Sequence, residues 1–309
     1  MARVVSNEAL EKFLKAELPT NLLEYTGHFG GGCINEGQSF KTDLGVVFVK
    51  TNKKDGSRLM FEGEYNSLDA IKKSGTVRVP NPIKVLDHPE GTGAMLVMEH
   101  LDLKSLKNHQ FQALLGLQLA RLHLQNIDKL SKGSNDAVAK FGFHTTTCCG
   151  YLSMSNEWTD DWVTFYVNNR LESQISKLLS EHDDQELKEL WTKLKAKIPH
   201  YFEGLDVKPS LLHGDLWGGN IGEIETGPVI FDPASFYGHH EFELAIAGIF
   251  GGFSAEFYSS YHQLIPKADG FDDRHHLYQL FHYLNHWNHF GSSYRPSAIS
   301  IMKSLTAIQ

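Results

Sequence analysis

An aspartate, an asparagine and a second aspartate stand at a spacing that few folds accommodate. The segment His213-Gly214-Asp215-Leu216-Trp217-Gly218-Gly219-Asn220 is followed by a short apolar run that leads into Asp232. In phosphoryl transfer an aspartate orients the attacking hydroxyl, and an asparagine with a later aspartate holds the Mg²⁺ ions that bridge the phosphates. Each element alone is compatible with turn capping, but the whole pattern matches the protein-kinase signature. We therefore predict that Asp215 is a catalytic base and that Asn220 and Asp232 are metal ligands.

A lysine at the end of an apolar run supports this prediction. The residues Val46-Val47-Phe48-Val49-Lys50 are typical of a buried strand. In kinases such a lysine binds the α- and β-phosphates of ATP and pairs with a glutamate on the following helix. Residues 57–74 have helical periodicity, and we predict Glu64 as the partner, with Glu62 in reserve. By itself a strand-end lysine is usually a solvated charge, so its role depends on the downstream motif.

Residues 27–37 form a glycine-rich stretch that includes Gly31, Gly32 and Cys33. Glycines let backbone N–H groups approach phosphate closely, and we predict that these three residues bind the nucleotide. The spacing is neither a Walker A motif nor a clean G-x-G-x-x-G, so a flexible hairpin is the alternative. Backbone dipoles that bind phosphate also favour the thiolate form of a nearby cysteine such as Cys33. Our hypothesis is that oxidation of Cys33, including a disulfide-linked dimer, blocks the site; an inert small residue is the alternative.

The order of the expected elements indicates an α+β architecture, with strands first and helices afterwards. The division falls near residues 99–102, where we expect the backbone of Glu99, His100 and Leu101 to contact adenine. Residues 1–99 would form a strand-rich nucleotide-binding lobe, and residues 100–309 a helical catalytic and substrate lobe. We expect strands at 46–50 and 94–98, an edge strand at the end of 77–85, a loop at 131–140, and helices at 6–18, 57–74, 113–123, 158–180, 184–197 and over most of 241–290.

Composition excludes several classes of partner. A net charge of -8 and a pI of about 6.1 argue against nucleic acid as a ligand. No run of eighteen apolar residues suggests a membrane span. The first residues lack the apolar region of a secretory signal. Three cysteines indicate a reducing compartment, so we expect a cytoplasmic protein.

A histidine-rich segment near the C-terminus is the remaining candidate for a functional site. His286-Trp287-Asn288-His289 has no accompanying zinc pattern among the 17 histidines of the chain. We predict that His286 and Trp287 line a substrate cleft, with a solvated helix surface as the alternative. Trp217 would stack against the acceptor, although packing is an equally good interpretation of an aromatic at this position.

Longer runs of residues resemble the fructosamine kinase / ketosamine-3-kinase family, which has a protein-kinase-like fold. The resemblance covers nearly the whole chain. The runs that carry it are Gly31-Gly32-Cys33-Ile34, Val47-Phe48-Val49-Lys50, Met60-Phe61-Glu62-Gly63-Glu64, Val97-Met98-Glu99-His100, Phe141-Gly142-Phe143-His144, Thr147-Cys148-Cys149-Gly150, Leu212-His213-Gly214-Asp215-Leu216-Trp217, Phe231-Asp232-Pro233-Ala234-Ser235-Phe236-Tyr237-Gly238-His239 and Asn285-His286-Trp287-Asn288-His289-Phe290-Gly291.

The resemblance implies a bilobal kinase, a single domain of the fructosamine-kinase type, that uses ATP and Mg²⁺. It implies phosphorylation of the 3-hydroxyl of ketosamines on glycated lysine side chains or on small molecules, which leads to protein deglycation. The ketosamine-3-kinase (protein-ribulosamine 3-kinase) branch is the most similar, with ribulosamines and psicosamines as expected substrates and fructosamines as poor ones. Oligomeric state is left open between a monomer and a redox-linked dimer.

Two departures from regulated protein kinases bear on control. Gly214 stands where those enzymes have an arginine that reads an activation-loop phosphate, and Pro233 stiffens the position after Asp232. Both favour a constitutively assembled site. A kinase for another small hydroxylated molecule, of the aminoglycoside or choline type, is the alternative within enzymes. A silent nucleotide-binding scaffold is the other alternative, but the complete set of Lys50, Asp215, Asn220 and Asp232 argues against it.

Overall fold

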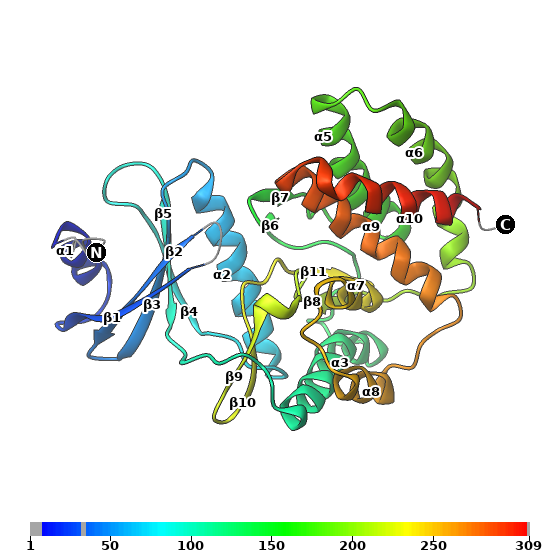
Figure 1. Ribbon diagram of the computed structural model, residues 1–309. Helices are drawn as coiled ribbons and strands as arrows, with labels where there is room; N and C mark the ends of the chain where they lie inside the picture. Colours follow the sequence, from blue (N-terminus) through cyan, green and yellow to red (C-terminus); the bar gives the residue numbers. More distant parts are fainter. Residues whose placement is uncertain (1–7, 32–34, 308–309) are drawn as a thin grey trace.

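The N-terminal lobe is an antiparallel sheet with a helix on each face. The computed structural model describes residues 8–31 and 35–307. The strands lie in the order β1-β2-β3-β5-β4, with α1 on the outer face and α2 between the sheet and the rest of the molecule (Figure 1). Their bounds are α1 (Glu8–Glu17), β1 (Leu23–Gly31), β2 (Glu36–Thr42), β3 (Gly45–Asn52), α2 (Ser57–Ser74), β4 (Pro82–Asp87) and β5 (Ala94–Glu99).

Strand β5 shows why this sheet needs both helices. Its first five residues, 94–98, are all apolar, and successive side chains of a strand point to opposite faces. Leu96 packs into the cluster that includes Leu68 and Ile71 of α2, whereas Met95 packs into the cluster that includes Leu14 of α1. A strand that is covered on both faces carries a continuous apolar run instead of an alternation of apolar and polar residues. Residues 94–98 of β5 form such a run.

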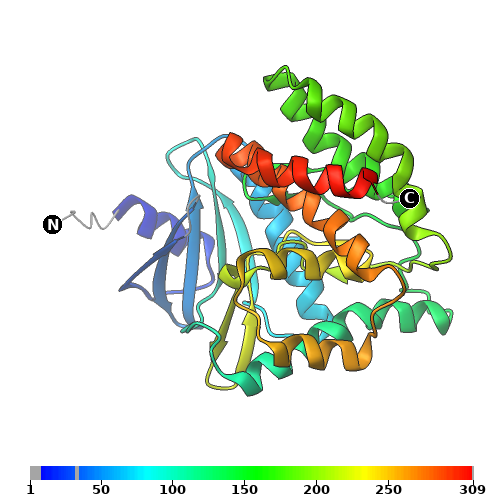
Figure 2. The ribbon, with the colours of Figure 1, turned by 45° about the vertical axis from the view of Figure 1, so that its right-hand side comes forward.

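The C-terminal lobe is mainly helical and carries short hairpins at its border with the N-terminal lobe. Figure 2 shows α5 and α6, in green, at the upper edge of this lobe, beyond the red α10. The elements are α3 (His109–Ser131), β6 (Thr147–Cys149), β7 (Leu152–Met154), α4 (Trp162–Phe165), a π-helix (Tyr166–Glu172), α5 (Ser173–Glu181), α6 (Gln185–Lys197), β8 (Ser210–Leu212), β9 (Ile221–Ile224), β10 (Gly227–Ile230), β11 (Phe236–Gly238), α7 (His240–Phe250), α8 (Ala255–Leu264), α9 (Phe271–Phe290) and α10 (Arg295–Ala307).

Backbone hydrogen bonds join the β9–β10 hairpin to the N-terminal half of the chain. Ile230 N donates to Arg78 O over 3.0 Å, just before β4. Lys104 and Glu223 exchange backbone bonds of 2.9 and 2.8 Å, just after the linker between the lobes. The hairpin that ends immediately before Asp232 is therefore fixed on both sides, which sets the position of this carboxylate relative to the sheet.

Most of the expected elements are present. Helix α2, strands β3 and β5, the edge strand β4 and the loop after α3 are confirmed. Two predictions were wrong in their bounds. Helix α3 extends beyond 113–123 at both ends; it starts at His109 because the Asn108 side chain caps it by accepting from Gln110 N and Phe111 N, and it continues to Ser131. The expected helix at 158–180 starts only at Trp162 and is interrupted by the π-helix, within which Arg170 is fully buried.

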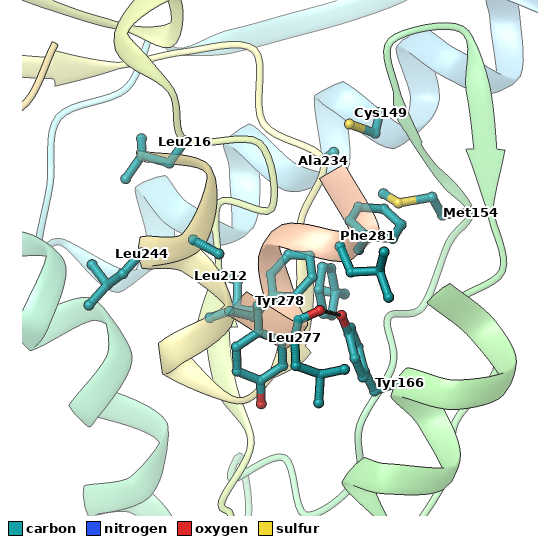
Figure 3. Packing of buried hydrophobic residues seen from close by; sticks show 14 of the residues in the cluster. Cys149, Met154, Tyr166, Leu212, Leu216, Ala234, Leu244, Leu277, Tyr278 and Phe281 are labelled. Atoms are coloured by element: carbon teal, nitrogen blue, oxygen red, sulfur yellow. Dashed lines mark hydrogen bonds between the residues drawn. The ribbon is translucent and has the colours of Figure 1, made fainter. Parts of the chain in front are cut away.

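Aromatic side chains fill the centre of the C-terminal lobe. Trp162 Nε1 donates to Tyr278 Oη over 2.9 Å, and Tyr166 Oη donates to the Leu277 carbonyl over 2.7 Å. Figure 3 shows Tyr166, Leu277 and Tyr278 within the buried cluster. The polar ends of these rings thus have partners, so the rings can be buried at little desolvation cost.

One buried group in this core lacks such a partner. His282 of α9 is fully buried, and its ring lies 5.2 Å from that of Phe242 and 5.1 Å from that of Phe281. Neither ring nitrogen has a hydrogen-bond partner among the described residues. Burial lowers the pKa of His282 well below its ordinary value, so the ring is neutral in the folded protein.

We predict that His282 makes the protein acid-sensitive. The unfolded chain protonates this histidine below pH 6.5 and the folded chain does not, so its contribution to stability is complete above pH 6.5 and is lost as the pH falls. In His282→Phe the drop in unfolding free energy between pH 7.5 and 5.5 should shrink by about 1.4 kcal/mol, one proton over one pH unit. Urea titrations at both pH values measure it, with the exposed His276→Phe as control. An identical pH dependence in wild type and His282→Phe would contradict the prediction.

Candidate active site

A buried glutamate holds the loop that carries Asp215. Glu243 of α7 is fully buried, and its carboxylate accepts hydrogen bonds from the backbone N–H groups of His213 and, over 2.9 Å, Gly214. Gly214 has φ 86°, and a Cβ there would lie 2.2 Å from the carbonyl oxygen of Ala234. An arginine at this position is therefore excluded by backbone conformation and by space. The sequence interpretation missed Glu243, although a second glutamate beside Glu241, directly before the apolar run of α7, signals it.

The ring of His213 connects this loop to the strand that precedes Asp232. Nδ1 accepts from the backbone N–H of Asp215 over 3.3 Å, so Nε2 carries the proton and donates to the Phe231 carbonyl over 2.9 Å. Burial lowers the pKa of His213 and keeps the ring in this neutral form. The two segments that carry Asp215 and Asp232 are thereby held in fixed register.

Asn220 lies against Asp215, as their spacing predicts. Its Nδ2 donates to the backbone carbonyl of Asp215 over 2.8 Å and approaches the carboxylate oxygen Oδ2 at 3.4 Å. The Asp215 side chain retains some contact with solvent, but its carboxyl group is recessed. Burial, with repulsion from Asp232, raises the pKa of Asp215 to about 7. The sequence analysis did not anticipate this shift, because it arises from groups that only the fold brings together.

Lys50 joins both lobes through two carboxylates. Its Nζ lies 2.9 and 2.8 Å from the two carboxylate oxygens of Glu64 on α2, so the predicted ion pair is present. The same nitrogen lies 2.8 Å from Asp232 Oδ1. Burial raises the pKa of Asp232, but the Lys50 ammonium outweighs it, and the net shift is downward. Glu62, the reserve partner, faces outward and pairs with Arg58 instead.

The site has a surplus of negative charge held by oxygen donors. One ammonium stands among the carboxylates of Glu64, Asp232 and, when ionised, Asp215. Asp232 has φ 56°, an uncommon backbone conformation for a residue other than glycine, and such strain is typical of functional positions. Because Asn220 uses its Nδ2 to bind Asp215, its amide oxygen remains available as a ligand. A hard divalent cation suits this donor set.

In the linker between the lobes, two of the three backbone N–H groups that were predicted to contact adenine already donate to carbonyl groups of the protein. Glu99 N donates to the Asn81 carbonyl over 2.9 Å, and His100 N donates to the Val46 carbonyl over 3.1 Å. The carboxylate of Glu99 binds the guanidinium of Arg78 and accepts from Asn81 N. Among the residues that the structure describes, none is hydrogen-bonded to Leu101 N. Of the three linker N–H groups, that of Leu101 is therefore the one left for a ligand, whereas those of Glu99 and His100 already have backbone acceptors.

A hollow of about 490 Å³ lies beside the segment that follows this linker in the chain. It is lined by residues 103–107, by Gly218 and Gly219 of the catalytic loop, and by Phe231. Among the predicted phosphate-loop residues, Gly31 ends β1, opposite Glu36 of β2. Gly32 and Cys33 lie outside the described residues, so the hypothesis about oxidation of Cys33 stays a prediction.

Three residues were predicted to contact the substrate that accepts the phosphoryl group. Two of them face the surface and one does not. The ring of Trp217 is 38% exposed and lies over Gly219, where a Cβ would come within 2.2 Å of it. Phe250 stands between Trp217 and His286, with ring centroids 6.0 and 4.9 Å away. Trp287 is only 3% exposed and packs in the core, so its predicted contact with substrate was wrong. One residue along a helix turns a side chain by about 100°, which separates it from His286.

Comparison with known proteins gives consistent results. A sequence model described as fructosamine kinase matches residues 7–308. Mouse ketosamine-3-kinase is 54% identical over 311 residues, covering 96% of this chain and 100% of the mouse protein. The chloroplastic protein-ribulosamine 3-kinase of Arabidopsis thaliana is 38% identical, covering 96% of this chain and 87% of the plant protein.

Solved structures extend the likeness to the fold. A crystal structure from Thermobifida fusca, provisionally named fructosamine-3-kinase, superposes with a TM-score of 0.78 at 24% identity, covering 97% of this chain and 99% of that one. A complex of an aminoglycoside phosphotransferase with streptomycin and ATP gives a TM-score of 0.60 at 15% identity, covering 100% and 98%. The bilobal protein-kinase-like fold expected from the sequence is thus confirmed.

We predict that Glu243 is required to hold the catalytic loop. In Glu243→Leu the two backbone N–H groups lose their acceptor inside the core, and each unsatisfied group costs about 1–3 kcal/mol. The unfolding free energy should fall by about 2–6 kcal/mol, and the amides of His213 and Gly214 should exchange with solvent faster than in wild type. Exposed Glu225→Leu serves as control. Unchanged exchange at these two amides would contradict the assignment.

Proposed function

The chain belongs to the fructosamine kinase family, and from this premise we propose that it transfers the γ-phosphoryl group of ATP to the 3-hydroxyl of ketosamines on glycated lysines. The observation that carries the proposal is the convergence of Lys50, Asp215, Asn220 and Asp232 from distant segments into one site. A non-catalytic scaffold has no need of this complete set. The relatives named ketosamine-3-kinase and protein-ribulosamine 3-kinase support the choice of acceptor.

The nucleotide lies between the lobes in this proposal. Leu101 N–H binds the adenine, the hollow lined by residues 103–107 receives the ribose, and the phosphates are bound by Gly31, Gly32 and Cys33, as the sequence predicts. Lys50 binds the α- and β-phosphates and is held for this by Glu64. We also propose that the lobes divide after Glu99. The nucleotide is therefore contacted by residues from both 1–99 and 100–309.

Mg²⁺ is the metal that the donor set fits best. The Asn220 amide oxygen and the Asp232 carboxylate are hard ligands beside a net negative charge. When bound, the metal neutralises charge on the transferring phosphates. Lys50 also binds Asp232, so a bound metal would take as ligand a carboxylate that the ammonium already contacts.

Asp215 accepts the proton of the attacking hydroxyl. The sugar oxygen forms its bond to the γ-phosphorus while the bond from that phosphorus to the β–γ bridging oxygen breaks, and ADP leaves. A pKa of about 7 makes the Asp215 carboxylate a better proton acceptor than an ordinary aspartate. Glu243 and Asn220 keep the loop and its carboxylate in place, so that much of the catalysis is positioning.

The acceptor binds on the side of Trp217 and His286. The ring of Trp217, two residues beyond Asp215, stacks against the sugar or its lysine linker. His286 Nδ1 donates to the His282 carbonyl over 2.7 Å, which leaves Nε2 as an acceptor for a sugar hydroxyl. Ribulosamines and psicosamines are the preferred substrates in this proposal, and fructosamines are poor ones. Phosphorylation at the 3-hydroxyl makes the adduct unstable and regenerates the lysine amine.

The remaining proposals concern the state of the protein in the cell. No helix in the described part of the chain is long and apolar enough to cross a membrane. Cys148 and Cys149 are free thiols, in keeping with a reducing compartment, and we propose a cytoplasmic protein. A monomer suffices for the site described, and a dimer linked through Cys33 is the form that oxidation would produce.

Purified protein with Mg²⁺-ATP and a panel of acceptors tests the function. Ribulosamine, psicosamine and fructosamine derivatives of lysine, on peptides and as small molecules, are compared with an aminoglycoside, choline and free sugars. The expected result is ADP release with ketosamines and a phosphate mapped to the 3-hydroxyl. ADP release only with an aminoglycoside, choline or a free sugar would show that the acceptor is that molecule and not a ketosamine. No ADP release with any compound of the panel would favour the non-catalytic scaffold.

The variant Asp215→Asn separates catalysis from binding. Loss of the base should lower kcat by about 10²–10⁴-fold, because this is the usual contribution of a positioned general base. ATP affinity should stay within about twofold, since Asp215 does not bind the nucleotide in this proposal. Stopped-assay turnover and calorimetric ATP binding measure the two effects. Near-normal turnover would refute the role of Asp215.

A further inference from the structure

A further contact between the lobes lies one helical turn from Glu64. Ser67 of α2 accepts a hydrogen bond at Oγ from the backbone N–H of Ser235 over 3.0 Å, and its own hydroxyl donates to the Gly63 carbonyl over 2.7 Å. Both serines are fully buried. Ser67 follows Glu64 by three residues, and Ser235 follows Asp232 by three. The bond therefore joins the two segments that carry these carboxylates, and nothing in the mechanism described above uses it.

The backbone of Ser235 is held on both sides. Its N–H donates to Ser67, and its carbonyl accepts a longer bond, 3.4 Å, from Thr147 Oγ1. Thr147 is fully buried and accepts in turn from Asn156 Nδ2 over 2.8 Å. The side-chain hydroxyl of Ser235 has no hydrogen-bond partner among the described residues, so the connection runs through the backbone. The loop after Asp232 thus offers α2 a fixed surface.

Gly63 lets α2 approach the C-terminal lobe closely. A Cβ on this residue would lie 2.6 Å from the Thr146 carbonyl oxygen and 3.0 Å from the Cα of Thr147. Both atoms belong to the backbone, so the helix would have to shift to make room. Glycine is a poorer helix former than alanine, so its presence here weakens the isolated helix. Its advantage is the close approach that it permits.

The carboxylates of Glu64 and Asp232 repel each other, and one ammonium lies between them. Lys50 Nζ is 2.8 Å from Glu64 Oε2 and 2.8 Å from Asp232 Oδ1. Burial raises the pKa of Glu64 to about 7; the Lys50 ammonium opposes this shift, and Asp232 adds to it. An outward movement of α2 would relieve the repulsion and separate Glu64 from Lys50. The bond between Ser67 and Ser235 involves no charged group, and it holds the two segments together against this repulsion.

We propose that Ser67 is a positioning residue for nucleotide binding, which keeps α2 docked on the C-terminal lobe so that Glu64 presents Lys50 to the phosphates. This inference rests on the proposed function only in that Lys50 binds the phosphates of ATP, and it holds for any acceptor. In a variant without this hydroxyl, the N–H of Ser235 lacks a partner unless α2 moves and water enters. ATP binding must then restore the docked arrangement and remove that water, so affinity is lost.

Calorimetric binding of Mg²⁺-ATP to Ser67→Ala tests this role. The dissociation constant should rise about three- to thirtyfold, within the range for losing a hydrogen bond and leaving a buried N–H unsatisfied. KM for the acceptor should change by less than about twofold, because the contact lies on the nucleotide side of the site. An ATP affinity equal to that of wild type would overturn the proposal.

Ser74→Ala is the matched control. This serine lies at the end of the same helix, and its hydroxyl bonds to the Ile71 carbonyl and to Thr76, both within the N-terminal lobe. Its removal should leave ATP affinity unchanged. A loss equal to that in Ser67→Ala would show a general effect on α2 and would overturn the proposal.

A double-mutant cycle measures whether Ser67 acts through Glu64. Glu64→Gln alone should weaken ATP binding. In that background Ser67→Ala should have little further effect, because no carboxylate remains to be positioned. Additive losses would assign Ser67 a general structural role and would overturn the proposal. Should Ser67→Ala fail to fold, Ser67→Cys keeps a side chain of similar shape with a weaker acceptor, and the same cycle applies.

Gly63→Ala tests the close approach independently. It should also weaken ATP binding, and a weakened helix cannot be the cause, since alanine is the better helix former. Unchanged affinity would contradict the docking of α2. These binding measurements need no acceptor. A wild-type protein that binds ATP but phosphorylates no ketosamine would overturn the proposed function alone, because ATP binding by the variants still decides this inference.

Discussion

The contact of Lys50 with both Glu64 and Asp232 is the interaction on which the site depends. It joins a strand, a helix and the loop after β10, and the two carboxylates come from opposite lobes. Removing Lys50 would leave the buried carboxylate of Glu64 uncompensated, which costs several kcal/mol, whereas the side chain of Asp232 is 44% exposed and its loss would leave Lys50 paired with Glu64. The relative position of the lobes is thus tied to the group that binds phosphate. The same charges that attract a metal nucleotide also hold the cleft together.

The sequence predicted the parts of the site whose chemistry is encoded locally. Asp215, Asn220 and Asp232 follow a fixed spacing, and Lys50 and Glu64 lie on elements with clear periodicity, so their meeting could be expected. Their roles in catalysis, metal binding and nucleotide binding stay predictions that the variants above address. The fold class followed from the order of strands and helices and was confirmed by solved structures.

Other features depend on contacts that no local pattern carries. Glu243 reaches the loop from 29 residues away, and Cys149 meets Asn285 across 136 residues. For Trp287 the sequence analysis made the opposite error, because it predicted a contact that the structure does not show. A cluster of polar and aromatic residues was taken to share one face, but helical rotation sends this ring into the core. The interrupted helix around Arg170 was equally invisible, because a buried guanidinium supported by carbonyl oxygens leaves no periodic signal.

The bonds that join the β9–β10 hairpin to Arg78 and Lys104 have a consequence for nucleotide capture. Opening the lobes as rigid halves would break the bond from Ile230 N to the Arg78 carbonyl, which crosses from residues 100–309 to residues 1–99, while the bonds between Lys104 and Glu223 hold the hairpin within the C-terminal lobe. The two walls of the cleft are therefore set at their working separation before ATP arrives. Little conformational entropy remains to be lost on binding, so selectivity among nucleotides rests on the shape of a preformed cavity instead of on closure around the ligand.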